Sequence, residues 1–551
     1  MRYKKIIILS IILTSLLVVS AVSAADNATD DVCDVDEYEF DNNQTLKVNE
    51  IEEDVLSASS PEDSFNALNN LINGNNNKEI KLTKDYNFYN DKWDKQFATG
   101  IPISRSVVID GDWHILDANY AARMFEIKHN NITLKNIIFI HGKSTDGSIG
   151  GAITFRDSYY ENWFNVTNCM FISNQNTALA GGYAINSTFI RNTGGLGGAT
   201  YMTTYIENCT FKYNYASTHG GAINWGRIVK NSVFIGNTIG YGEGGAVWGT
   251  SDVENCMFMD NYGGGALSCG NARNCVFINN RGWSDGGAIS GNEKYSAVNC
   301  TFIGNSALNG GAISYINAIN CTFKDNTATE YGGAIYKANA TNCFFINNKA
   351  AIEGNDEYNS TLIKTSTKLI VPAVNTIYND ERHLIITLKD QYDNPLIGYE
   401  VSVNFNGKAS NFSTGSNGQV KISTKTLAPG TYDARISFNG NINYDKSTLN
   451  SKVVVKKATP KLTANKKTFK VKVKTKKYSV TLKTNQNKAL AKAQVTIKVN
   501  GKTYKATTNA KGKATFKITK LTKKGSFKAT VAYKGNKYYT SLTKNVKITI
   551  K

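Results

Sequence analysis

The stretch that decides the fold is residues 299–348, which reads NCTFIGNSALNGGAISYINAINCTFKDNTATEYGGAIYKANATNCFFINN. It contains the phrase Asn-Cys-Xaa-Phe three times, and the first two copies are each followed by Gly-Gly-Ala-Ile. The phenylalanine of the phrase recurs from Phe139 to Phe345 at intervals of 18 to 32 residues, most of them close to 22. Self-similarity at this period predicts stacked copies of one small unit, and the length suits one coil of a β-solenoid.

Strand geometry explains the phrase. Alternation with period two places Ile319, Cys321 and Phe323 on one apolar face, which we expect to point into the solenoid. The asparagine three residues after each phenylalanine, such as Asn305, and the glycines that follow are expected at corners, because both residue types tolerate a left-handed backbone. Stacked coils would place these asparagines about 4.8 Å apart, with their amides hydrogen-bonded along a ladder. The prediction is an all-β fold, a right-handed parallel β-helix of about ten coils.

The two phrases also carry a resemblance. Asn-Cys-Thr-Phe and Gly-Gly-Ala-Ile, within residues 100–355, resemble the polymorphic outer-membrane protein repeats of the pectin-lyase-like right-handed β-helices. Such repeats are found in bacterial autotransporters and in archaeal adhesin-like surface proteins. The resemblance implies a surface adhesin, and it leaves a polysaccharide lyase or hydrolase as the alternative, because pectin-lyase-like folds often carry those enzymes.

Seven of the nine cysteines occupy one position of the repeat. They are Cys169, Cys209, Cys256, Cys275, Cys300, Cys321 and Cys343, and Ser187 and Ser232 fill the same position in two other coils. A ladder of buried free thiols is predicted rather than disulfides, because the Cβ vectors of stacked neighbours run parallel. Cys269 follows Leu267 and is expected on the same inward strand face. The chain has no Cys-x-x-Cys pair, and we expect neither a metal site nor a cofactor.

The N-terminal part divides by composition. Residues 1–24 predict a secretory signal peptide, with an uncleaved membrane anchor as the alternative. Residues 25–60 hold twelve acidic residues against one lysine and predict a disordered leader. Ser60 is expected to be the N-cap of a short amphipathic helix that covers the open end of a β-helix spanning residues 61–361.

Two related segments follow the β-helix. Residues 362–457 and 458–551 align at an offset of 94 to 95 positions, so that Asn406-Gly407-Lys408 matches Asn500-Gly501-Lys502. Each consists of short alternating strands broken by Gly and Asn turns, which predicts a β-sandwich. Both resemble the bacterial Ig-like domains of surface proteins, in which such modules act as stalks.

The positive charge lies in the second of these segments. Residues 458–551 contain 26 lysines and no Asp, Glu or Arg, so the rest of the chain carries 37 basic residues (63 minus 26) against 44 acidic ones. Lysines alternate with apolar residues and are expected to cover one sheet face. The predicted envelope contacts are Lys470, Lys472, Lys474, Lys476 and Lys477. A surface with this much positive charge binds polyanions, and an anionic cell-wall polymer is the expected partner rather than nucleic acid. A lysine-rich surface for solubility is the alternative.

An enzyme of this fold needs clustered carboxylates. The best cluster in the sequence is Asp110, Asp112, Asp117 and Arg123, with Arg105 nearby, in the first coils. Scattered surface charge explains it equally well, and the chain is expected not to be an enzyme.

The function that the sequence favours is a secreted, cell-surface or cell-wall-associated adhesin. Its β-helix would present a surface for glycans or proteins of other cells, and the Ig-like domains would form a stalk. The ligand-contact candidates are Trp163, Tyr201, Trp225, Trp248, Trp283, Tyr315 and Tyr331, because exposed aromatic rings on a flat β face suit sugars. A structural envelope scaffold is the further alternative.

Overall fold

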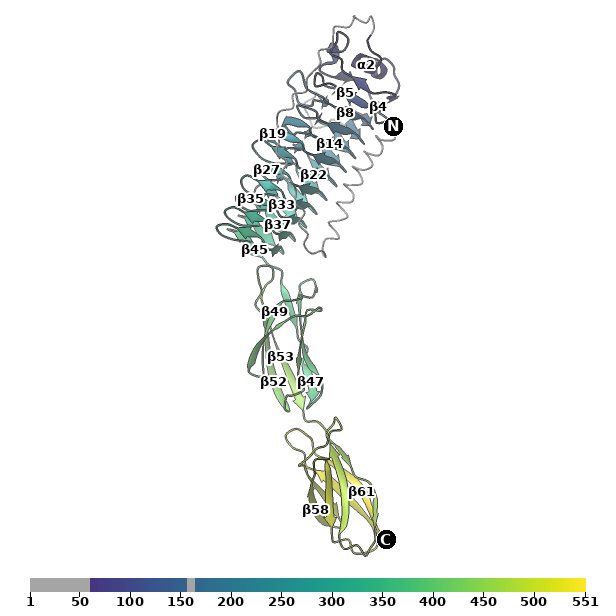
Figure 1. Cartoon of the computed structure of the whole chain (residues 1–551), viewed down its shortest axis with the longest axis vertical. Coiled ribbons are helices and arrows are strands. Elements are labelled where there is room, and N and C mark those ends of the chain that lie inside the picture. The colour runs from purple at the N-terminus through teal and green to yellow at the C-terminus, as the bar shows by residue number, and fades with distance from the viewer. Residues whose placement is uncertain (1–59, 156–163) are drawn as a thin grey trace. The chain divides into compact units, whose positions relative to one another are not determined.

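A computed structural model describes residues 60–155 and 164–551 (Figure 1). The signal segment, the acidic leader with Cys33, and Trp163 lie outside the described residues. The chain forms two compact units, of which the first ends at Ile363 and the second is Lys364–Lys551. The two units are described in turn.

The first unit is a parallel β-solenoid. One coil contains β34 (Thr301–Ile303), β35 (Ser306–Ala307), β36 (Ile313–Ser314) and β37 (Asn317–Ile319). Each strand pairs in register with its counterpart in the next coil, as Phe302 does with Phe323 and Ile313 with Ile335. The strands of β37 type form a 13-stranded sheet, those of β34 and β36 type form 12-stranded sheets, and those of β35 type form an 8-stranded sheet. The predicted parallel β-helix is confirmed, and coils without the repeat phrase extend it back to β1 (Glu79–Lys81).

The sheet that contains β36 carries most of the site described below. It is called the isoleucine sheet here, after the isoleucine of the Gly-Gly-Ala-Ile phrase. Its strands are β3 (Ile101–Ile103), β6 (Phe125–Ile127), β9 (Ile153–Phe155), β12 (Leu179–Ala180), β16 (Thr200–Tyr201), β20 (Ile223–Asn224), β24 (Val247–Trp248), β28 (Leu267–Ser268), β32 (Ile289–Ser290), β36, β40 (Ile335–Tyr336) and β44 (Glu357–Tyr358).

A column of phenylalanine rings fills the solenoid. From Phe139 to Phe345 the rings of successive coils stack with centroids 4.6–5.1 Å apart and planes within 3–12° of parallel. Each ring is almost completely buried. Because the phenylalanines recur at a nearly regular spacing in the chain, their rings form one continuous apolar core.

A second column consists of buried asparagines. Its members are Asn174, Asn192, Asn214, Asn237, Asn261, Asn280, Asn305, Asn326 and Asn348. Asn305 donates from Nδ2 to Oδ1 of Asn326 at 3.0 Å and to the carbonyl oxygen of Phe277 at 3.0 Å. Its own Oδ1 accepts from the backbone N–H of Asn280 at 2.9 Å. The predicted amide ladder is present, and it satisfies backbone groups where the chain turns.

The corner geometry differs from the prediction in one respect. The left-handed residue is the one before the buried asparagine, namely Gly304 (φ 63°) in one coil and Asp325 (φ 55°) in the next. A second left-handed corner at Asn320 (φ 54°) separates β37 from β38 (Thr322–Lys324). This corner breaks the period-two alternation, so Ala318 is buried and Ile319 is 37% exposed. The expected inward position of Ile319 is therefore wrong, while Cys321 and Phe323 do point inward.

The Gly-Gly pairs lie where the chain crosses onto the isoleucine sheet. Gly310 has a φ of 59°, and a Cβ on Gly311 would lie 2.2 Å from the carbonyl oxygen of Gly333 in the next coil. Neither position has space for a side chain, which explains why the pair recurs in most coils.

The cysteine column is also confirmed. All seven repeat cysteines are buried and free, and Ser187 and Ser232 continue the column. The Cys321 thiol donates to the carbonyl oxygen of Ala297 at 3.4 Å, and burial raises the pKa of Cys169 to about 12. Cys269 is different: its left-handed backbone (φ 57°) places it at a corner, partly exposed, so its expected inward position is wrong.

The predicted capping helix is present as α2 (Phe65–Asn73) at one end of the solenoid (Figure 1). Its N-cap is Ser64, whose hydroxyl accepts from the N–H of Ala67 at 3.1 Å, rather than the expected Ser60. Phe65, Leu68 and Ile72 are fully buried, and the ring of Phe65 packs edge-on against Phe88. The helix therefore covers the first coil.

The second unit contains two β-sandwiches with the same strand order. The first has sheets β46-β48-β51 and β47-β53-β52-β49-β50, and the second has β54-β56-β59 and β55-β61-β60-β57-β58. The strands of the first are β46 (Thr367–Ile370), β47 (Val374–Ile377), β48 (His383–Asp390), β49 (Glu400–Phe405), β50 (Lys408–Ser413), β51 (Gln419–Ser423), β52 (Gly430–Phe438) and β53 (Ser447–Lys456). Those of the second are β54 (Lys461–Thr463), β55 (Lys467–Phe469), β56 (Lys476–Lys483), β57 (Gln494–Val499), β58 (Lys502–Thr507), β59 (Lys513–Ile518), β60 (Gly525–Tyr533) and β61 (Leu542–Ile550).

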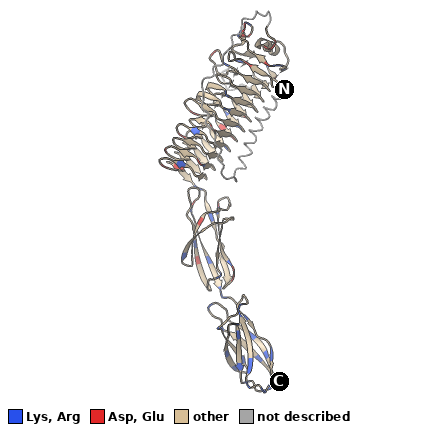
Figure 2. Ribbon diagram, viewed as in Figure 1, with Lys and Arg blue, Asp and Glu red and all other residues tan. Residues whose placement is uncertain are grey.

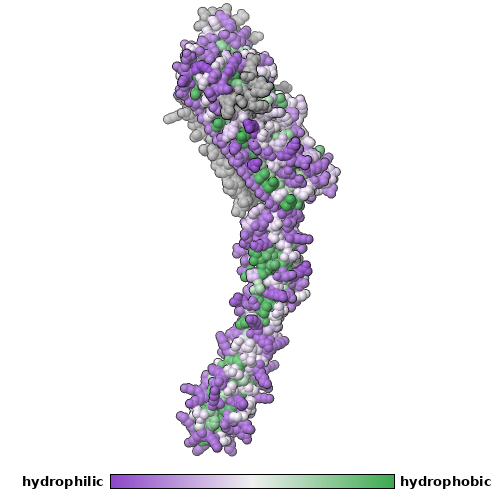
Figure 3. Space-filling model, turned by 180° about the vertical axis from the view of Figure 1, so that it is seen from behind, coloured by the Kyte–Doolittle hydropathy of each residue, from purple (hydrophilic) through white to green (hydrophobic). Residues whose placement is uncertain are grey.

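Charge and hydropathy differ between these sandwiches. Figure 2 shows acidic and basic residues in the first and only basic residues in the second. On the side seen in Figure 3, hydrophobic side chains gather over the first sandwich. Its exposed apolar residues include Tyr392, at 59%, and Ile397, at 55%. The two copies share a fold but present different surfaces.

Candidate functional site

Two aromatic clusters lie where strands of the isoleucine sheet end. The first, called the tryptophan cluster, consists of Trp225, Trp248 and His219. The indole rings of Trp225 and Trp248, from successive coils, have centroids 5.9 Å apart, and the His219 ring lies 4.7 Å from Trp248. Trp225 is 47% exposed, because its left-handed backbone (φ 59°) turns it outward. Tyr201 occupies the same strand position one coil before Asn224.

The second cluster, called the tyrosine cluster, consists of Tyr315, Tyr331, Tyr336, Tyr358 and Lys337. Tyr315 meets Tyr336 edge-on at 5.7 Å, and Tyr358 lies 4.6 Å from Tyr331. The Lys337 ammonium lies over both Tyr336 and Tyr315, 4.8 and 5.6 Å from the ring centroids. Tyr315 has the same left-handed conformation as Trp225, with a φ of 58°.

A hollow of about 440 Å³ lies beside Tyr315. It is lined by Gly242, Glu243, Gly264, Trp283, Ser284, Asp285, Ser290, Gly291, Ser314 and Tyr315. A second hollow, of about 340 Å³, is also lined by Tyr315 and includes Glu293 and Lys337. The Trp283 ring is held edge-on by Tyr262 at 5.6 Å. Tyr315 and Gly291 therefore line both hollows.

Polar groups converge on the larger hollow. Ser314 is fully buried, and its hydroxyl has no hydrogen-bond partner among the described residues. Asp285, which accepts from the Asn309 amide at 2.9 Å, also lines the hollow. Burial raises the pKa of Tyr315, and the charge of Asp285 raises it further. Flat aromatic faces with a few hydroxyl and carboxylate groups are the chemistry of a site for a polyhydroxylated ligand.

The structure places the predicted aromatic residues in different surroundings. It brings Tyr315 and Trp283 to the hollow and Tyr331 to the neighbouring cluster, whereas Trp248 and Trp225 lie three and four coils from Tyr315, about 14 and 19 Å along the solenoid. Sequence reasoning missed Ser314, Asp285 and Glu243. A signal for the carboxylates does exist, since Glu243 and Asp285 each precede a Gly-Gly pair.

The lysine predictions need correction. Lys470, Lys472 and Lys474 are exposed, but they lie in the loop between β55 and β56 and not on a sheet face. Lys476 is only 1% exposed, and its ammonium donates to the carbonyl oxygen of Val473 at 2.7 Å. Lys476 is therefore not an envelope contact, because its charge is held inside the sandwich. Lys477 is exposed on β56.

The structure does not gather the carboxylates of the first coils into one site. Asp112 pairs with Lys81 at 3.1 Å, and Asp117 contacts His141 at 3.0 Å. Burial raises the pKa of Asp110, but hydrogen bonds from Asn136, the Asp112 amide and Lys135 outweigh it and leave the pKa below its usual value. Each carboxylate therefore has a structural partner of its own.

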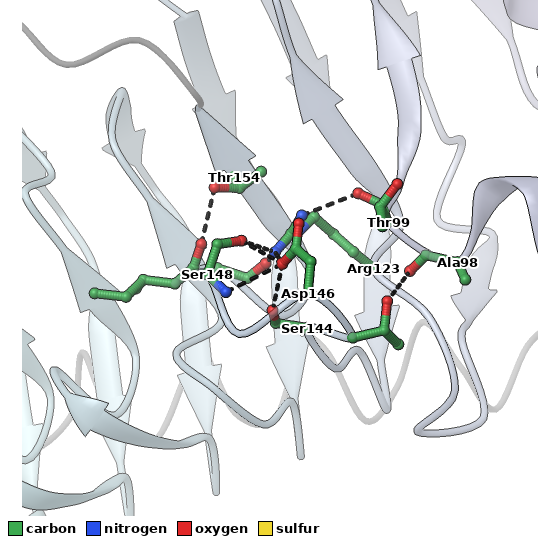
Figure 4. A network of polar contacts seen from close by, with 10 residues as sticks. Ala98, Thr99, Arg123, Ser144, Asp146, Ser148 and Thr154 are labelled. Atoms are coloured by element: carbon green, nitrogen blue, oxygen red, sulfur yellow. Dashed lines mark hydrogen bonds and ion pairs between the residues drawn. The ribbon is translucent and has the colours of Figure 1, made fainter.

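Arg123 is a buried structural residue (Figure 4). Its guanidinium donates to the carbonyl oxygens of Gly150 at 2.6 Å and Thr99 at 2.9 Å, and it contacts Asp146 at 3.2 Å. Arg105 donates to the carbonyl oxygens of Asn77 and of Ile72, which lies in the last turn of the capping helix. Both guanidinium groups are thus held by backbone carbonyl groups. Within the described residues, no group of His, Cys, Asp or Glu is placed to hold a metal ion.

The Arg123–Asp146 pair predicts a pH effect. Burial raises the pKa of Asp146, but hydrogen bonds from Ser148, Arg123 and Ser144 outweigh it and hold the pKa well below its usual value. The ionised carboxylate therefore contributes stability above pH about 4, and this contribution is lost as the pH falls through the folded-state pKa. We expect the difference in unfolding midpoint between the wild type and Asp146→Asn to shrink as the pH is lowered below about 4. A difference that stays constant from pH 7 to pH 3 would contradict the role of this pair.

Comparisons with known proteins agree with the repeat. Residues 320–337 match the Chlamydia polymorphic membrane protein repeat, which confirms the resemblance read from the same phrases. A comparison with curated proteins finds no match. The matched repeat on a β-solenoid indicates a surface protein of adhesin type.

Solved structures similar to the chain include bacterial adhesins. Invasin, a bacterial integrin-binding protein, is 17% identical over 34% of this chain and 39% of its own, with a TM-score of 0.23. A 1.5-MDa bacterial ice-binding adhesin is 12% identical over 35% of this chain and 69% of its own, with a TM-score of 0.17. Tandem titin domains match at a similar level, with 12% identity over 34% of this chain and 98% of theirs and a TM-score of 0.22. The chain thus spans well under half of the invasin chain.

In residues 60–155 and 164–551, no helix has the length and apolar composition needed to cross a membrane.

Proposed function

We propose that the chain is a cell-surface adhesin whose solenoid binds a saccharide in the hollow beside Tyr315. The observation that carries the proposal is that the exposed Tyr315 and the half-buried Trp283 line one depression together with the acidic residues Glu243 and Asp285. Sugars present apolar ring faces and many hydroxyls, so they suit such a site. The ligand would be a glycan of another cell.

We propose further that the protein binds this ligand without turning it over. The carboxylates nearest to an enzyme-like arrangement, Asp110, Asp112 and Asp117, are each engaged by a neighbouring side chain or amide of the solenoid. Hydrolysis or elimination needs an acid and a base that converge on one bond.

The remaining parts have supporting roles in this proposal. The protein acts outside the cytoplasm at the cell surface, the two sandwiches form the stalk, and the lysine-rich one associates with an anionic cell envelope. Its 26 lysines without an acidic residue support that last assignment.

A glycan screen tests the proposal. The full chain is applied to an array of neutral and acidic oligosaccharides, and the bound glycans are recovered and analysed for cleavage. We expect binding to a subset of glycans and no reducing-end or unsaturated product. Product formation that is lost in Asp110→Ala would identify a lyase or hydrolase instead. Binding to no glycan, with ordered self-assembly, would favour an envelope scaffold.

A further inference from the structure

The first sandwich serves as an internal comparison for the second. The two have the same strand order, and their registers match: Glu400 faces Ser413 as Gln494 faces Thr507, and both pairs lie at the same offset. Positions of one sandwich can therefore be assigned to the other strand by strand.

Every acidic residue of the first sandwich is replaced at its matched position in the second. In matched strands and turns of equal length the replacements are Asp390 by Thr484, Asp393 by Asn487, Glu400 by Gln494, Asp433 by Lys528 and Asp445 by Thr540, and the loop that holds Asp380 and Glu381 corresponds to one without an acidic residue. One replacement keeps the local hydrogen bond. Asp390 accepts from the amide of Asn394, and Thr484 accepts from the matched amide of Lys488. The fold is retained while the negative charge is removed.

Two ion pairs of the first sandwich become unpaired positive charge in the second. Asp433 and Lys452 face each other across β52 and β53, and the matched residues Lys528 and Lys547 face each other across β60 and β61. Lys389 faces Lys368 across β46 and β48 and pairs with Asp393 at 3.7 Å, whereas the matched Lys461 and Lys483 face each other beside the neutral Asn487, to which Lys461 donates at 2.9 Å. Like charges directly opposite each other destabilise a sheet. A surface selected only for solubility has no need of such pairs.

The densest such surface is the outer face of β54, β56 and β59, called the lysine face here. Its members are Lys461, Lys477, Lys483, Lys513 and Lys517, together with Thr463, Ser479, Thr481 and Thr515. Two lysine pairs face each other across strands: Lys461 with Lys483, and Lys477 with Lys517. Along β56 the two pairs are six residues apart, about 20 Å, and hydroxyl side chains fill the interval.

We propose that the lysine face binds an extended anionic polysaccharide. This inference rests on the proposed association of the basic sandwich with the cell envelope and assigns it a face and a ligand class. Acidic groups of the polymer would occupy the two lysine pairs and relieve their repulsion, and sugar hydroxyls would meet the row of Thr and Ser side chains. The aromatic residue of β56, Tyr478, is buried, so this face lacks the stacking ring of single-strand nucleic-acid binders.

The test compares two variants of the full chain that lose the same charge. One is Lys461→Gln/Lys477→Gln/Lys483→Gln/Lys517→Gln, on the lysine face. The control is Lys502→Gln/Lys511→Gln/Lys523→Gln/Lys524→Gln, which changes four exposed lysines elsewhere on the same sandwich. Affinity for polygalacturonate is measured as a function of salt, with neutral dextran as the blank.

We expect the lysine-face variant to lose at least about tenfold in affinity at low salt, and its slope of log affinity against log salt to fall by about three to four, because each contacting lysine releases about one counterion. The control should lose less than about threefold. The control variant should have the same thermal unfolding midpoint as the wild type. The midpoint of the lysine-face variant should be equal to or higher than that of the wild type, because like-charge pairs are removed.

Three results would overturn the proposal. Equal losses in the two variants would show that the charge acts without a site, although envelope association would stand. Binding to phosphatidylglycerol vesicles or to oligo(dT) but not to polygalacturonate would assign the face to a lipid surface or a nucleic acid. Failure of the wild type to bind any of these anions would remove the envelope association itself.

Discussion

Replacing Asn305 with alanine is expected to lower the free energy of unfolding by about 2 to 4 kcal/mol. The Asn305 side chain accepts from the N–H of Asn280 and donates to the carbonyl oxygen of Phe277 and to Asn326. Alanine would leave the N–H of Asn280 buried without a partner, and it would break the amide column in the middle. A buried donor that loses its partner costs its full desolvation.

The matched control is Asn299→Ala. Asn299 belongs to an exposed column, in which its Nδ2 donates to Asn274 at 3.3 Å, and water can replace that bond. We expect a loss of about 1 to 2 kcal/mol, most of it because alanine adopts the left-handed backbone of Asn299 (φ 54°) less readily than asparagine does. The measurement is chemical denaturation of both variants with the same denaturant. Equal losses would show that the buried column does not differ in importance from the exposed one.

Phe302→Ala is the second large effect, with an expected loss of about 3 to 5 kcal/mol. The Phe302 ring lies between Phe277 and Phe323, with centroids 5.1 and 4.8 Å away, and is completely buried. Removing it opens a cavity that the flanking coils cannot close without breaking their register.

Ile303 provides the control, because it is the next residue of β34 and points outward, half-buried. Ile303→Ala should cost about 1 kcal/mol, and hydrogen exchange should show faster local opening around β34 only in Phe302→Ala. Similar exchange in both variants would contradict the idea that the ring column holds the coils together.

The columns of the solenoid were predictable because they depend only on spacing. Cys321, Phe323 and Asn326 keep fixed distances in the chain, so stacking follows once the period is known. Ile319 could not be placed by the same alternation, because the left-handed Asn320 reverses the sense of the pattern at a corner. A hydrophobic period of two holds only within one strand.

The candidate site was only partly predictable. Aromatic residues at Trp283 and Tyr315 stand out in the sequence, but Ser314 reads as an ordinary outward serine, and its burial depends on the Gly-Gly crossing that covers it. Arg123 shows the reverse case. Its charge suggested a surface role, whereas the side chain is completely buried and its guanidinium donates to carbonyl oxygens of neighbouring coils.

The most direct test of the central claim is a calorimetric titration of the best glycan from the screen into three forms of the full chain. These are the wild type, Tyr315→Ala and Tyr213→Ala. Tyr213 is the matched control, since it is also exposed and left-handed (φ 55°) but lies at the corner that follows a strand of the β34 type, away from the hollow. We predict that Tyr315→Ala weakens binding at least about tenfold, as the loss of one stacked aromatic ring implies, and that Tyr213→Ala binds like the wild type. Unchanged affinity in Tyr315→Ala would show that the hollow beside this ring is not the binding site.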